Sequence, residues 1–223
     1  MKIGLGKLFQ YSEKFEILLA FYIFLVVASE TLGFKLIGFG QVDGWMVNLS
    51  VASFFLPFIY SINDMVTEVY GVKKTLSMSR LSLVIIFCLG MMALIFTNLP
   101  PSPKFLASEA AYDQVFGFSI RASLASLTAF AVAQWSDVFV FAKIRQKMKK
   151  SQLWLRNNLS NLVSLFIDTA VFMIIARYNF NETLSGNIIY LVGIILPYWG
   201  AKMLVSLLAT PLVYRGVRWL KSL

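Results

Sequence analysis

Residues 77–97 have the sequence SMSRLSLVIIFCLGMMALIFT, and no charged residue follows Arg80 within this stretch. A helix of about 20 apolar residues can span the hydrocarbon core of a bilayer, because its backbone hydrogen bonds are all made within the helix. Residues 77–97 therefore predict a transmembrane helix. This one segment already favours a membrane protein over a soluble domain.

Five further stretches have similar length and apolar character. Together they give six predicted spans, at residues 16–37, 45–64, 77–97, 120–141, 159–177 and 188–214. Hydrophobic residues make up 58% of the chain and charged residues 14%, far from the composition of soluble proteins. We therefore expect an all-α integral membrane protein in which residues 1–223 form a single domain, a bundle of six transmembrane helices. Pro197 and Pro211 provide places for the last span to bend.

The Lys and Arg residues form clusters between the spans, and rich clusters alternate with poor ones. Rich clusters precede the first span, follow the second and fourth, and close the chain, whereas the opposite loops hold only Lys35, Lys104, Arg121 and Arg177. Because positively charged loops stay in the cytoplasm, both termini are predicted to be cytoplasmic. The net charge of +9 is thus interpreted as a topology signal, and we expect no nucleic-acid partner.

The residue types exclude several classes of site. The chain has no histidine and one cysteine, Cys88, so His-dependent catalysis, His-bearing metal sites and intrachain disulfides are absent. It has no Walker-type or Gly-rich phosphate loop. We therefore expect no catalytic residues, no metal, no cofactor and no enzyme activity. The first apolar stretch follows a basic segment as in a signal peptide, but its pattern continues to Ile37, so a retained helix is expected.

Several charged residues lie inside the apolar spans or at their edges: Glu30, Asp64, Asp137, Asp168 and Lys202. A charge at the centre of a membrane helix costs about 2.5–3.5 kcal/mol on insertion scales, so these residues need partners or water. Polar residues also share helix faces, as in the series Asn157, Asn161, Ser164 and Asp168. The polar residues either join helices to one another or line an internal cavity, and we favour a cavity.

The segment 58–71, FIYSINDMVTEVYG, resembles the queuosine precursor transporter family, also known as the vitamin uptake transporter family. The resemblance continues in order through RASLAS at 121–126, AFAVAQWSDVFVF at 129–141, LWLRNNLS at 153–160, IDT at 167–169, Lys202, and TPLVY at 210–214. These pieces cover most of residues 20–220. Glu30 stands where the first helix of the family is expected to have Asn.

The resemblance implies uptake of 7-cyano-7-deazaguanine, its aminomethyl relative, or both, across the cytoplasmic (inner) membrane of a bacterium, to supply tRNA queuosine modification. Such a base has adjacent N–H donors that one carboxylate can accept, a carbonyl that needs a donor, and a planar ring that can stack. The candidate acceptors are Asp64, Glu68, Asp137 and Asp168; the candidate donors are Arg121, Gln134, Asn158 and Lys202; the candidate stacking residues are Phe58, Trp135, Phe141 and Trp154.

The preferred hypothesis is a site at the membrane midplane, lined by the second, fourth, fifth and sixth spans, with Asp137 or Asp168 accepting from the guanidine-like edge. Three alternatives stay open. The chain is the substrate-binding subunit of an uptake system with a separate ATPase, or it transports another purine-like or vitamin-like molecule, or it is a membrane enzyme. The partners expected besides the substrate are the lipid bilayer and, for so small a bundle, a second copy in a homodimer. The sequence leaves the preferred precursor and the energy source open.

Overall fold

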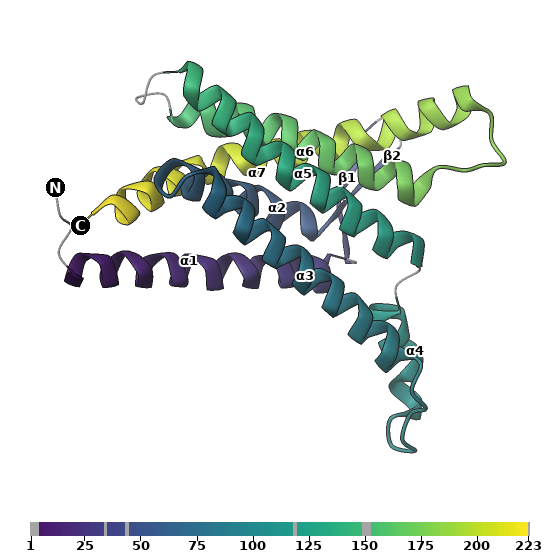
Figure 1. The fold of residues 1–223 in the computed structure, drawn as a ribbon. Coiled ribbons are helices and arrows are strands. Elements are labelled where there is room, and N and C mark those ends of the chain that lie inside the picture. The colour runs from purple at the N-terminus through teal and green to yellow at the C-terminus, as the bar shows by residue number, and fades with distance from the viewer. Residues whose placement is uncertain (1–4, 34, 43–44, 118–119, 149–152, 223) are drawn as a thin grey trace.

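The computed structural model describes residues 5–33, 35–42, 45–117, 120–148 and 153–222, and these form helices and one β-hairpin (Figure 1). The helices are α1 (Leu5–Leu32), α2 (Ala52–Val69), α3 (Val72–Thr97), α4 (Leu106–Phe116), α5 (Ile120–Lys147), α6 (Leu153–Arg177) and α7 (Leu184–Lys221). The strands are β1 (Leu36–Val42) and β2 (Trp45–Ser50).

Five of the described helices are long and apolar enough to cross a membrane: α1, α3, α5, α6 and α7. Their outward surfaces are apolar, with Phe24 of α1, Val84 of α3 and Leu208 of α7 all exposed. Polar side chains are instead found inside, where Asp64, Gln134 and other polar residues are fully buried. This inside-out distribution of polarity is the one expected for a bundle surrounded by lipid. The chain is a multi-pass membrane protein.

Helix α2 is at the centre of the bundle. It packs against α1, α3, α5, α6 and α7, and its residues from Ile59 to Glu68 are buried on every side. A helix enclosed by protein needs no apolar outer surface, which explains why α2 can include both Asp64 and Glu68. At 18 residues, α2 is about 27 Å long, close to the thickness of the hydrocarbon core.

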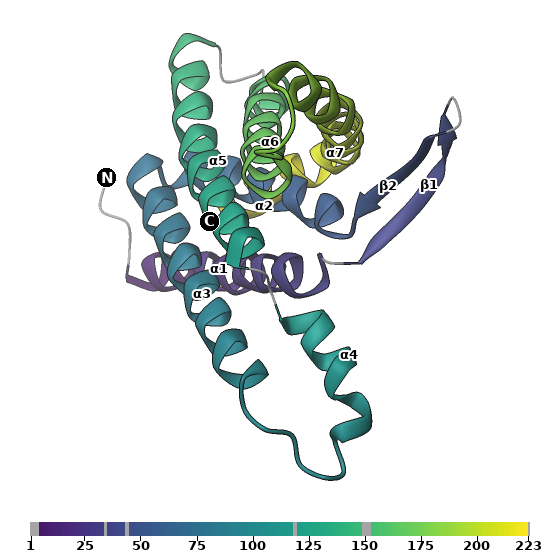
Figure 2. The same ribbon diagram turned by 90° about the vertical axis from the view of Figure 1, so that its right-hand side faces the viewer.

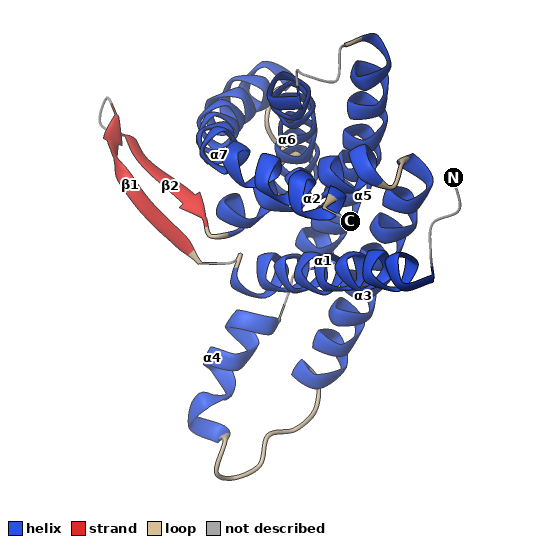
Figure 3. Cartoon of the chain, turned by 90° about the vertical axis from the view of Figure 1, so that its left-hand side faces the viewer, coloured by secondary structure: helices blue, strands red, loops and turns tan. Residues whose placement is uncertain are grey.

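The β-hairpin lies between α1 and α2, and its presence shows that two predicted helix boundaries are wrong. Residues 45–50, which the hydropathy pattern placed in the second span, form β2, and α1 ends at Leu32 instead of continuing to residue 37. β1 and β2 pair antiparallel, with Leu36 opposite Ser50, and project from the helices (Figures 2 and 3). Gly38 and Gly40 weaken any helix here, and Asp43-Gly44 is a residue pair typical of two-residue hairpin turns.

Both described ends of the chain are at the same end of the bundle (Figure 1). The Lys14 ammonium of α1 donates to the backbone oxygens of Trp219 and Ser222, at 2.9 and 2.7 Å. At the opposite end, α4 forms part of the long connection between α3 and α5. Together with the adjoining end of α3 it projects away from the other helices (Figure 2).

Candidate functional site

A cavity of about 610 Å³ lies in the half of the bundle away from the termini. The ends of α1 and α6, the starts of α2 and α5, the second half of α3 and the middle of α7 line it. The ends of the hairpin also contribute, through Leu36 and Ser50. Its size is within the range of about 300–1,000 Å³ that is usual for small-molecule sites. The wall is mostly apolar, so the few polar groups on it are the ones that can select a ligand.

Lys202 of α7 and Asp168 of α6 form a buried ion pair on the cavity wall. The Lys202 ammonium lies 2.9 Å from an Asp168 carboxylate oxygen and 2.9 Å from the hydroxyl oxygen of Thr169. A lysine ammonium has three N–H donors, so these two contacts leave one donor for a ligand. Both residues are predicted site residues, and the structure brings them together across two helices.

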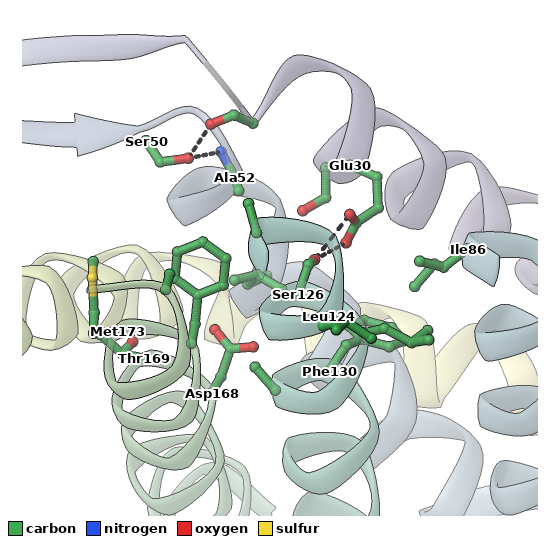
Figure 4. Close-up of a pocket in the computed structure, with 18 of the residues that line it drawn as sticks. Glu30, Ser50, Ala52, Ile86, Leu124, Ser126, Phe130, Asp168, Thr169 and Met173 are labelled. Carbon is green, nitrogen blue, oxygen red and sulfur yellow. Dashed lines mark hydrogen bonds between the residues drawn. The ribbon is translucent and has the colours of Figure 1, made fainter. Parts of the chain in front are cut away.

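A second acidic group, Glu30 of α1, lines the cavity together with Ser126 of α5. The Ser126 hydroxyl donates to the Glu30 carboxylate, with distances of 2.8 and 2.9 Å to its two oxygens. Among the described residues, no Lys or Arg lies within ion-pair distance of the Glu30 carboxylate. Figure 4 shows the Glu30 and Asp168 carboxyl groups directed toward the space between α1, α5 and α6. The cavity therefore has an unpaired carboxylate facing an ion pair.

Aromatic side chains complete the cavity, although they differ from the predicted stacking residues. Phe130 of α5, Phe172 of α6 and Tyr198 of α7 line it. The predicted Phe141 is fully buried elsewhere, with the Arg156 guanidinium 5.7 Å from its ring centre. The predicted Trp154 is half exposed on the outer surface, where its backbone N–H donates to the Tyr214 hydroxyl.

Three further predicted residues, Asp64, Gln134 and Asp137, are fully buried near the middle of the bundle and do not line the cavity. Asp137 accepts from the hydroxyls of Ser160 and Ser164, at 2.8 and 2.7 Å. Gln134 accepts from the side-chain amide of Asn63 and from the hydroxyl of Ser79. We call the buried groups Asn63, Asp64, Gln134, Asp137 and Asn161 the central polar cluster.

Glu68, another predicted acceptor, is surrounded by basic groups. Its carboxylate lies 3.0 Å from Arg145 of α5, 3.0 Å from Arg156 of α6 and 3.6 Å from Lys221 of α7. These four residues, the Glu68 cluster, tie four helices together at the end of the bundle where the termini lie. The charge of Glu68 is thus already compensated within the protein.

Two predicted donors remain. Asn158 of α6 exchanges hydrogen bonds with the Thr210 hydroxyl of α7, at 3.0 and 3.3 Å. It belongs to a series of contacts along the antiparallel pair of α6 and α7 that also includes Asn161 with Ser206, so its amide joins helices. Arg121 is at the start of α5, and its side chain lies outside the described part of the structure.

Sequence reasoning did not include Glu30 in the site, although it identified Glu30 as a charge inside an apolar span. The sequence therefore did contain a signal for Glu30, namely a charge inside an apolar span. What the sequence did not show is that the end of α1 faces the ends of α5 and α6, which only the tertiary arrangement reveals.

The chain was compared with known proteins. The model of a family described as "Putative vitamin uptake transporter" matches residues 50–216. A "Probable queuosine precursor transporter" of Bacillus subtilis (strain 168) is 41% identical over 70 residues, which is 31% of this chain and 31% of the relative. A protein of the same name from Haemophilus influenzae is 26% identical over 166 residues, covering 71% of this chain and 67% of the relative. No solved structure shows significant similarity to the chain.

Proposed function

Because the chain belongs to the vitamin uptake transporter family, a family of membrane transporters, we propose that it imports queuosine precursors of the 7-deazaguanine class. The match over residues 50–216 and the names of two bacterial relatives support this choice of substrate. The observation on which the proposal depends most is the cavity, with the Glu30 carboxylate facing the Lys202–Asp168 ion pair.

The groups in the cavity complement a 7-deazaguanine. Such a base presents two adjacent N–H donors on its guanidine-like edge, and the two oxygens of the Glu30 carboxylate can accept both. The remaining N–H of Lys202 can donate to the ring carbonyl, while Asp168 and Thr169 hold the ammonium in place. Phe130, Phe172 and Tyr198 offer surfaces for the planar ring. Glu30 thus replaces Asp137 and Asp168 as the preferred acceptor.

The cavity lies in the half of the bundle away from the termini, and the basic Glu68 cluster is at the end where the termini lie. If the positively charged end is cytoplasmic, the cavity faces the exterior of the cell. With α2 counted as a span beside the five apolar helices, the proposed topology has six spans. This orientation fits uptake across the cytoplasmic membrane of a bacterium, with the cytoplasmic side closed in the present conformation.

The test is to express the chain in bacteria that can neither synthesise nor import deazaguanines, then measure queuosine in tRNA after feeding each precursor. The wild type is expected to restore the modification. Glu30→Gln and Lys202→Met each remove a charge-assisted hydrogen bond worth about 1.5–3 kcal/mol, so uptake at low precursor concentration should fall about 10- to 100-fold. Glu109→Gln, a half-buried residue of α4 outside the cavity, is the matched control and should behave as wild type.

Membrane abundance of each variant is measured in the same cells by immunoblot. A wild-type protein that reaches the membrane and restores no queuosine with either precursor would overturn the proposed substrate. Normal uptake by both cavity variants would leave the substrate standing and remove the assignment of the site.

A further inference from the structure

The central polar cluster contains two carboxyl groups, Asp64 and Asp137, that form no ion pair within the described structure. Asp64 of α2 and Asp137 of α5 are both fully buried and interact electrostatically with each other. Neither Asp64 oxygen has a hydrogen-bond partner among the described residues, and the second oxygen of Asp137 also has none. Buried polar groups are normally paired, so three unpaired carboxylate oxygens need an explanation.

Within the central polar cluster the atoms without a hydrogen-bond partner are five oxygens and one donor, the side-chain nitrogen of Gln134. The Asn161 amide nitrogen donates to Ser206 at 2.7 Å, and the Asn63 amide nitrogen donates to Gln134, so both amides are oriented. The carbonyl oxygens of these two amides have no donor in the described structure. Oxygen acceptors from α2, α5 and α6 thus gather at one level of the bundle. The unpaired oxygens outnumber the one unpaired amide nitrogen, so the cluster has room for a positive ligand.

Neighbouring charges do not supply it. The titratable and charged groups nearest the cluster on the packed helices include Tyr22 of α1, Tyr60 and Glu68 of α2, Arg145 of α5, Arg156 and Asp168 of α6, and Lys202 and Lys221 of α7. Arg145 pairs with Glu68. Arg156 and Lys221 pair with Glu68, and Lys202 pairs with Asp168. The described part of α3 facing the cluster contributes only the hydroxyls of Ser79 and Ser82. Arg156 also interacts electrostatically with Asp64, but its ion pair is with Glu68, so neither Asp64 nor Asp137 has an ion-pair partner among the described residues.

We propose that the central polar cluster binds a monovalent cation, a proton or a sodium ion, with Asp64 as its principal ligand. Asp137 keeps its own charge more easily than Asp64, because the hydroxyls of Ser160 and Ser164 donate to it, and Asp64 has no such donors. The described residues include no group of three or more acidic, His or Cys side chains that could hold a metal. Divalent ions of the Ca²⁺ type favour several carboxylates and six to eight oxygens, so a single positive charge fits the cluster better.

The cluster is also placed to couple this cation to transport, an extension that rests on the proposed function. Tyr60 of α2 is fully buried and interacts electrostatically with Asp168, on the cavity wall, and with Asp137, in the cluster. The central helix α2 therefore connects the cavity, the cluster and Glu68. Binding of a cation beside α2 can then shift the equilibrium between two positions of this helix. Movement of the same helix would open the cytoplasmic side.

The first test measures cation binding without any substrate. Thermal unfolding of the purified protein in detergent is followed as Na⁺ replaces choline at constant pH and ionic strength, and separately as pH is lowered at constant Na⁺. The wild type should unfold about 5–10 °C higher at about 100 times the dissociation constant of the cation. Asp64→Asn should lose this response and, without the cation, unfold at or above the wild-type temperature, since a buried unpaired charge is gone.

Glu109→Gln is the control and should respond as wild type. A response to Na⁺ identifies sodium as the ligand, and a response to pH that Asp64→Asn removes identifies the proton. No response of the wild type to either cation, or an equal response of Asp64→Asn, would overturn the proposal. A lowered unfolding temperature of Asp64→Asn under cation-free conditions would also count against it, because the carboxylate would then be stabilising.

The second test measures coupling in proteoliposomes that contain only this chain. 7-Cyano-7-deazaguanine uptake is followed with an imposed proton gradient, an imposed sodium gradient, or none. One of the two gradients should drive accumulation above the external concentration, and Asp64→Asn should lose that accumulation. Uptake that stops at the external concentration with both gradients would contradict coupling. Absence of any uptake, with the thermal response intact, would contradict the proposed function and leave the cation site standing.

Discussion

At the scale of the residue, the charged groups outside the central polar cluster are held in different ways. Lys202 and Asp168 compensate each other on the cavity wall, Glu68 has three basic partners, and Glu30 has only the hydroxyl of Ser126. A charge that is fully compensated within the protein has little left to offer a ligand. A charge with unused hydrogen-bonding capacity is available to a ligand, and for this reason Glu30 and Lys202 are the proposed contacts.

The Lys202–Asp168 pair predicts a strongly non-additive double-mutant cycle. Lys202→Met and Asp168→Asn each leave one group buried without its partner, which costs about 3–5 kcal/mol of unfolding free energy for a buried pair. The double variant removes both charges and should be destabilised less than the sum of the single variants. Chemical unfolding in detergent measures all four proteins. Additive effects would show that the two side chains do not depend on each other.

The Glu68 cluster predicts unequal roles for its basic members. Arg156 is buried and lies 3.0 Å from Glu68, whereas the Lys221 side chain is half exposed at 3.6 Å. Arg156→Met should therefore destabilise the protein by about 3–5 kcal/mol, and Lys221→Met by less than about 1 kcal/mol, because water screens exposed pairs. Thermal unfolding of the two variants side by side checks this order. A loss for Lys221→Met as large as that for Arg156→Met would refute it.

Sequence reasoning identified which residues are expensive to bury, but it did not show what each one contacts. Asp168 and Lys202 were predicted as site residues and do line the cavity. Asn158 had the same polar character in the sequence, yet its amide is used between α6 and α7. Partners 34 to 88 residues apart, such as Lys202 with Asp168 and Arg156 with Glu68, can be recognised only once the helices are packed.

At the scale of the element, hydropathy located the apolar helices well and the connection between α1 and α2 poorly. Residues 45–64 are apolar enough to resemble one span, but in the structure they divide into β2 and most of α2. Average hydropathy is insensitive to this division, because strands and membrane helices use similar apolar residues. The Asp43-Gly44 pair was the local signal that distinguishes the two. Helix α2 can include Asp64 and Glu68 because its neighbours are protein, a condition that no local pattern records.

The turn between α2 and α3 predicts a stability loss at one glycine. Gly71 has φ +86° and ψ 166°, a region that is essentially restricted to glycine. Gly71→Ala should destabilise the protein by about 1–3 kcal/mol through backbone strain. Gly193→Ala, inside α7 with open space around the added methyl group, is the matched control. It should be neutral or slightly stabilising, because alanine favours helix. Equal unfolding temperatures for the two variants would argue against a strained turn.

At the scale of the whole molecule, polar groups form a continuous sequence from the cavity through the central polar cluster to the Glu68 cluster. The cavity is open and lies away from the termini, and the other two regions are closed by packed side chains. A transporter needs access to its site from each side in turn. The proposed import therefore requires access to the cavity from the side away from the termini, and we expect the Glu68 cluster to separate for release.

The predicted topology can be checked by labelling single cysteines in a Cys88→Ala background. Ser102→Cys is in the connection between α3 and α4, and Gln146→Cys is in the last turn of α5, at the other end of the bundle. In intact spheroplasts a membrane-impermeant maleimide should label Ser102→Cys, while Gln146→Cys should react only after permeabilisation. The reverse result would place the termini and the basic clusters outside.

The central claim is that a 7-deazaguanine occupies the cavity, and protection of a cavity cysteine tests it most directly. Ala176→Cys, in the Cys88→Ala background, introduces a thiol on the cavity wall of α6, and Ser102→Cys provides a thiol outside the cavity. The rate of alkylation by a small maleimide is measured with and without 7-cyano-7-deazaguanine. At about ten times the dissociation constant, the ligand should slow alkylation of Ala176→Cys about tenfold and leave Ser102→Cys unchanged. An unchanged rate at Ala176→Cys, at every concentration up to the solubility of the ligand, would contradict the claim.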